Sequence, residues 1–115
     1  MKSDSVSTQN VVGYIEGSDE NLKKEFIVIG AHYDHWGWGG KGSGSKKKDT
    51  LAIHNGADDN ASGVSALLSI LEKFHNDKIT TKRSIIFISF SGEEEGLLGS
   101  KYFVNHLPVE KTAVK

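Results

Sequence analysis

Two apolar runs with a helix pattern between them constrain the fold of this chain more than any other feature. Phe26–Ile29 and Ser84–Phe90 are rich in β-branched and aromatic residues, a composition typical of strands covered on both faces. The segment between them repeats with the period of an apolar helix face, through Val64, Leu67, Leu68, Leu71 and Phe74. Two strands joined by a helix form a βαβ unit, in which the strands run parallel. We therefore predict an α/β fold with an open, largely parallel sheet and flanking helices.

Shorter segments extend this pattern at both ends. Residues 10–15 predict a further strand before the first apolar run, and a short helix is expected over residues 96–106, ended by Pro108. Residues 36–50 are rich in glycine and include three consecutive lysines, so we predict an exposed loop there. No repeat or linker composition divides residues 1–115, which indicates one domain or part of one.

The composition excludes several classes of protein. Apolar residues make up 37% and charged residues 25% of the 115 residues, which is ordinary for a globular chain. With 14 basic and 15 acidic side chains there is no net field to attract nucleic acid or anionic lipid, so we expect neither nucleic acid nor a membrane as partner. The absence of cysteine excludes thiolate metal ligands. Residues 1–10 lack the apolar core of a signal peptide, and the localisation is left open.

Polar clusters stand at three points of the βαβ pattern. The sequence HYDH follows the first apolar run, GEEE follows the second, and GADDNASG precedes the helix. The carboxyl ends of parallel strands lie at the same edge of a sheet, where open α/β folds bind their ligands. We therefore expect these three clusters, which are distant in sequence, to converge in space.

The residue types in these clusters are those of a metal site. The candidates are one imidazole and four carboxylates, from His32, Asp34, Asp58, Glu93 and Glu94. So much negative charge in a small volume is unfavourable unless a cation compensates it or a carboxylate takes up a proton. Imidazole and carboxylate ligands suit Zn²⁺, with manganese or cobalt as alternatives. Asp34 follows His32 at the spacing that keeps both on one face of a strand, where it can orient the imidazole.

Each cluster also has a simpler interpretation. An acidic residue before a helix, here Asp58 or Asp59, is often only a helix cap. Consecutive glutamates are often a solvated turn, and we keep that interpretation for Glu95. His35 is a further candidate for a nitrogen ligand, and Trp36 is either a wall of the site or local packing. The expected meeting of all three clusters at one sheet edge favours a functional site over these separate explanations.

Three stretches in this order resemble the successive motifs of a known family. GAHYDHWG, NGADDNASGVSALL and RSIIFISFSGEEEGLLGSKYF are similar to those of the co-catalytic zinc aminopeptidases, metallopeptidase family twenty-eight, over about residues 26–106. The resemblance implies a three-layer α/β/α exopeptidase domain that hydrolyses peptide bonds with two zinc ions. Aminopeptidase action on peptide substrates is the leading expectation, and glutaminyl cyclisation or carboxypeptidase action are alternatives in the same family.

The resemblance also assigns roles to individual residues. It implies that His32 binds one zinc, Asp58 bridges both and Glu94 binds the other, with a cis peptide between the two aspartates. Glu93 would be the general base acting on the attacking water, and Asp34 would support His32.

In the family each zinc has one further protein ligand, and neither is found within residues 1–115. We therefore expect this chain to be a partial, C-terminally truncated catalytic domain that binds metal weakly and has little activity by itself. A different class of function is a non-catalytic, metal-binding remnant that self-associates through exposed sheet edges.

Overall fold

The computed structural model describes residues 6–115, so the first five residues of the polar N-terminal segment lie outside it. The strands and helices expected from the sequence are all present. In order they are β1 (Val11–Ile15), η1 (Leu22–Lys24), β2 (Phe26–His32), η2 (Ala57–Ala61), α1 (Ser62–Asn76), β3 (Ser84–Phe90), α2 (Leu98–Asn105) and η3 (Lys111–Ala113). Within residues 6–115 no helix combines the length and apolar character needed to cross a membrane.

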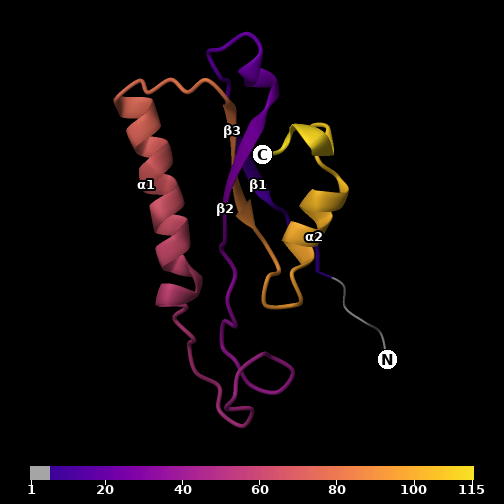
Figure 1. The fold of residues 1–115 in the computed structure, drawn as a ribbon. Helices are drawn as coiled ribbons and strands as arrows, with labels where there is room; N and C mark the ends of the chain where they lie inside the picture. Colours follow the sequence, from indigo (N-terminus) through magenta and orange to yellow (C-terminus); the bar gives the residue numbers. More distant parts are fainter. Residues whose placement is uncertain (1–5) are drawn as a thin grey trace.

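The three strands form one sheet in the order β1-β3-β2. β2 and β3 are parallel, with Phe26 opposite Ser84 and His32 opposite Phe90. β1 is antiparallel to β3. The parallel pair with α1 between its strands confirms the βαβ unit, and Figure 1 shows α1 and α2 on opposite sides of the sheet.

β3 is the centre of the hydrophobic core because its alternate side chains pack against different helices. Ile85 and Phe87 belong to the cluster that includes Leu67 of α1. Ile86 and Ile88 belong to a second cluster, with Phe103 of α2. The expected α/β fold is therefore present as helix, sheet and helix layers, and β3 is fixed from both faces.

β2 is less buried than its apolar sequence suggests. Phe26–Ile29 are half-buried, whereas five successive residues of β3, 84–88, are buried. The reason is position, since β3 has a strand on each side and β2 is an edge strand of the sheet. Beyond β2 there is one parallel bridge, between Phe26 and Val114. The apolar run thus predicted the strand correctly but not its place in the sheet.

Candidate metal centre

His32 is the last residue of β2 and places an imidazole at the carboxyl edge of the sheet. Its Nδ1 lies 3.1 Å from the backbone carbonyl oxygen of Asp34. A carbonyl oxygen only accepts hydrogen bonds, so in the neutral imidazole Nδ1 is the protonated nitrogen and Nε2 keeps its lone pair. Nε2 lies 3.0 Å from Asp59 Oδ1 and 3.9 Å from Glu93 Oε2. The free lone pair of His32 therefore faces carboxylates from the helix start and from the turn after β3.

The carboxylate of Asp34 holds the turn after β3 and does not hydrogen bond to His32. Asp34 Oδ1 accepts a hydrogen bond from the backbone N–H of Glu93 at 3.0 Å, and Oδ2 accepts one from Glu94 at 3.2 Å. Its nearest approach to His32 Nδ1 is 3.9 Å, which is too long for a hydrogen bond. The support expected for the imidazole comes from the Asp34 backbone, and the side chain fixes the two glutamates.

We expect Asp34→Ala to lower the zinc affinity of the protein about 10- to 100-fold, as loss of an outer hydrogen-bond partner typically does. The two backbone N–H groups of the turn lose their acceptor, so Glu94 is no longer held in place. Isothermal titration calorimetry with Zn²⁺ measures this. Asp49→Ala, in the exposed part of the loop, is the control and should bind as the unaltered chain does. Equal affinity in the two variants would contradict the role given to Asp34.

The two aspartates before α1 make contacts that differ from those expected from the sequence. Asp59, not Asp58, has its carboxylate beside His32. Asp58 Oδ1 accepts a hydrogen bond from Ser62 Oγ at 3.0 Å, and Asn60 Oδ1 accepts one from the backbone N–H of Gly63 at 3.0 Å. Asp58 and Asn60 therefore bond with the first residues of α1. The cis peptide is also one residue later than expected, between Asp59 and Asn60.

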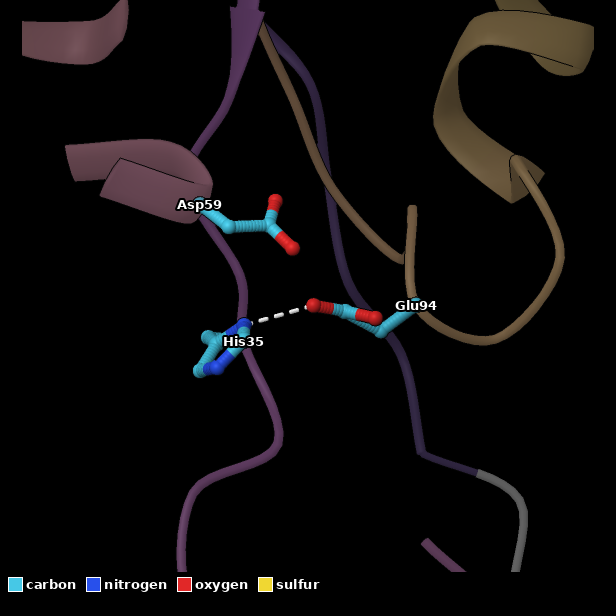
Figure 2. A group of neighbouring side chains, drawn as sticks. All are labelled: His35, Asp59 and Glu94. Atoms are coloured by element: carbon cyan, nitrogen blue, oxygen red, sulfur yellow. Dashed lines mark hydrogen bonds and ion pairs between the residues drawn. The ribbon is translucent and has the colours of Figure 1, made fainter. Parts of the chain in front are cut away.

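Three side chains from the three clusters converge at this edge. One ligand atom each of His35, Asp59 and Glu94 lie within 4.8 Å of one another. Figure 2 shows the Asp59 carboxylate above the pair formed by His35 Nδ1 and Glu94 Oε1, which are 2.5 Å apart. The predicted meeting of the clusters is thus present, and it includes His35. His35 follows the end of β2, where strand alternation no longer determines which way a side chain points.

The charges of this group are suited to a cation. Within residues 6–115, the basic partners of the Asp59, Glu93 and Glu94 carboxylates are histidines, and no lysine or arginine lies within ion-pair distance of them. Adjacent carboxylates without a compensating cation repel one another. The Asp59 side chain is 66% exposed, so the site is open to solvent. Nitrogen and oxygen donors of this kind match the ligand preference of zinc.

Trp36 contacts the site directly. Its indole Nε1–H donates a hydrogen bond to Glu94 Oε2, and its ring stacks on His35 with centroids 5.1 Å apart. Trp38, the other tryptophan, is 66% exposed. Of the two interpretations considered for Trp36, the structure supports a wall of the site. Residues 36–50 form a loop that is mostly exposed, yet Ser45 within it is buried.

Tyr33 anchors the segment before β1. Its hydroxyl donates a hydrogen bond to the carbonyl oxygen of Gln9 at 2.8 Å. Side-chain hydrogen bonds with Ser91 and Thr8 lower the pKa of the Tyr33 phenol, since they stabilise its ionised form. Tyr33 thereby joins the segment before β1 to the ends of β2 and β3.

The family assignment follows from comparison with known proteins. The model of Peptidase family M28 matches residues 10–115, which include every residue of the site described above. This chain belongs to peptidase family M28.

Its relatives and a solved structure agree with that assignment. The chain is 32% identical over 102 residues to Aminopeptidase YwaD of Bacillus subtilis, covering 88% of this chain and 18% of the relative. It is 33% identical over 96 residues to a probable zinc metalloprotease of Pyrenophora teres f. teres, covering 84% and 18%. The crystal structure of a zinc aminopeptidase from Bacillus subtilis superposes with a TM-score of 0.63 at 26% identity, covering 92% of this chain and 22% of that one. The chain thus spans about a fifth of the length of these proteins.

Proposed function

We propose that this chain forms the metal-binding core of a zinc aminopeptidase, which removes N-terminal residues from peptides. The observation that supports this best is the convergence of His35, Asp59 and Glu94 within 4.8 Å, beside His32. These donors come from three segments that the M28 model also covers. Similarity to proteins described as aminopeptidases and zinc metalloproteases supports the reaction class.

The donor set suggests which residues hold the metal. We assign His32 through Nε2, Asp59 and Glu94 as ligands, with His35 as an additional nitrogen donor beside Glu94. Asp59, rather than Asp58, would hold the metal, because its carboxylate lies beside His32 and within the group of His35 and Glu94. Bound zinc supplies Lewis acidity that polarises the scissile carbonyl and acidifies water, and two ions act together in such sites.

Glu93 is the residue we assign to proton transfer. Its backbone is fixed by Asp34, and its Oε2 lies 3.9 Å from His32 Nε2, beside the ligands. Its side chain is 34% exposed, so water and substrate can reach it. A carboxylate in this position can accept the proton of the attacking water and pass it to the leaving amine of the peptide. Glu95 is exposed and keeps its solvated role.

The test of this function is metal-dependent release of an N-terminal residue by the full-length protein. We expect zinc-loaded protein to hydrolyse leucine p-nitroanilide, to lose activity when a chelator removes the metal, and to regain it when Zn²⁺ is added back. Release of p-nitroaniline is followed by absorbance.

An N-acetylated form of the same substrate is the control, because an aminopeptidase requires a free amino group. Cleavage of blocked peptides from the carboxyl end would favour the carboxypeptidase alternative. Activity that is insensitive to the chelator would contradict a metal-dependent mechanism.

A further inference from the structure

The carboxylate of Glu94 has a different partner on each oxygen. Oε1 lies 2.5 Å from His35 Nδ1 and faces Asp59, whereas Oε2 accepts the indole N–H of Trp36. The Glu94 side chain is only 12% exposed, so these contacts define its position with little competition from water. From this geometry we propose that Trp36 is a positioning residue, which holds Oε2 of Glu94 so that Oε1 is presented to the metal. The inference rests on the proposed zinc site.

The chemistry of the indole suits this role. The Nε1–H group donates one hydrogen bond, cannot accept one and does not bind metal. It also keeps its proton throughout the pH range in which histidine and carboxylates titrate. Trp36 therefore cannot bind a cation, so it leaves Oε1 of Glu94 as the atom that does. A hydrogen bond to a carboxylate is among the stronger kinds, so it can fix which oxygen is free.

The glycine-rich loop packs against the edge of the indole that carries Nε1. A Cβ atom on Gly44 would lie 2.6 Å from Trp36 Nε1, so only glycine allows the backbone to pass this close. The imidazole of His54 also packs near the indole, with its centroid 5.7 Å from that of Trp36. His35 stacks on the indole at 11° between the ring planes. Contacts on several sides therefore leave the N–H of Trp36 directed at Glu94.

The loop itself is closed by backbone hydrogen bonds. Gly39 and Leu51 form an antiparallel bridge, and the N–H of His54 donates to the carbonyl oxygen of Gly37 at 2.8 Å. Buried Ser45 bonds to His54 Nε2 through its hydroxyl, also at 2.8 Å. Residues 37–54 are thus held as one unit against Trp36. The sequence predicted only that this loop is exposed, whereas its contacts with Trp36 also help to hold Glu94 in place.

The experiment compares the zinc affinity of the full-length protein with that of Trp36→Phe and Trp38→Phe. Phenylalanine keeps an aromatic ring over His35 but removes the N–H. We expect Trp36→Phe to weaken zinc binding about 10- to 100-fold in calorimetry, the usual effect of removing an outer partner of a ligand. Trp38→Phe should leave the affinity unchanged, since Trp38 is exposed.

Tryptophan fluorescence supplies a readout that general destabilisation would not reproduce. This measurement uses residues 1–115, which contain two tryptophans, so each Phe variant retains one. We expect the emission of Trp38→Phe, which reports Trp36 alone, to change with Zn²⁺ at the midpoint measured by calorimetry. The emission of Trp36→Phe should not change with Zn²⁺.

Two outcomes separate this inference from the function on which it rests. Failure of the unaltered protein to bind zinc overturns both the proposed function and the role of Trp36. Zinc binding by the unaltered protein with equal affinity in Trp36→Phe overturns only the role of Trp36.

Gly44→Ala provides a second variant if Trp36→Phe fails to fold. Its methyl group would displace the indole N–H of Trp36 while the tryptophan itself is kept. It should weaken binding relative to Lys46→Ala, an exposed substitution two residues away. Equal affinity in Gly44→Ala and Lys46→Ala would likewise overturn the role.

Discussion

In the full-length protein, Glu93→Gln is expected to lower the turnover number about 10²- to 10⁴-fold, the contribution typical of a general base. Glutamine matches the shape of glutamate but accepts no proton at neutral pH. Zinc content should not change, because Glu93 lies beside the ligands without belonging to the group of His35, Asp59 and Glu94. Hydrolysis of leucine p-nitroanilide and metal analysis of the same preparation measure the two quantities.

Glu95→Gln is the matched control for this experiment. Glu95 belongs to the same run of glutamates but is exposed, so its variant should retain both turnover and zinc. Loss of zinc in Glu93→Gln, with activity restored by excess metal, would mean that the base and ligand roles of Glu93 and Glu94 are exchanged. Unchanged turnover would remove Glu93 from the mechanism altogether.

Asp59→Ala should abolish measurable zinc binding, whereas Asp58→Ala should reduce it little. The carboxylate of Asp59 lies beside His32 and within the group of His35 and Glu94. Asp58 bonds instead with Ser62 in the first turn of α1. That contact is an exposed hydrogen bond between two side chains, so its loss should cost no more than about 1 kcal/mol of stability. Calorimetry with Zn²⁺ measures the affinities, and thermal unfolding measures the stabilities.

The two neighbouring substitutions control for each other, since both remove one carboxylate from the same turn. The opposite result, with zinc binding lost in Asp58→Ala and kept in Asp59→Ala, would restore Asp58 as the shared ligand. Equal losses would indicate that the turn as a whole, rather than one carboxylate, matters for the site.

Much of the fold could be predicted because its signals are local. The apolar run of β3 and the helix face through Leu67 and Phe74 identify the elements, and the rule for βαβ units gives the parallel pairing. The order of strands in the sheet is not local information. Nothing in the sequence of Phe26–Ile29 shows that β2 is an edge strand while β3 lies at the centre.

The site could be predicted to the level of segments but not of every side chain. His32 ends β2, and Glu93 and Glu94 lie in the turn after β3, so the predicted strand ends placed all three. Asp58 and Asp59 lie in an irregular turn that includes non-helical backbone angles at Asp59, so no period indicates which carboxylate faces the sheet edge.

The side-chain contacts of the loop after β2 could not be predicted from the sequence either. The contact of Trp36 with Glu94 and the bond of His54 with Ser45 depend on how a glycine-rich loop closes. His54 is half-buried as a result. Only the Trp-Gly pattern next to HYDH could have drawn attention to this loop.

The pairing of β2 and β3 affects how the site binds a cation. His32 and Phe90 are the final residues of their strands and stand opposite each other, so the segments with the donors leave the sheet at the same level. Backbone hydrogen bonds and packing hold that level in the absence of an ion. The points at which the donor segments leave the sheet are thus fixed in advance, which reduces the conformational entropy lost when a cation binds. Part of the affinity of this edge for a cation is therefore already determined when the sheet folds.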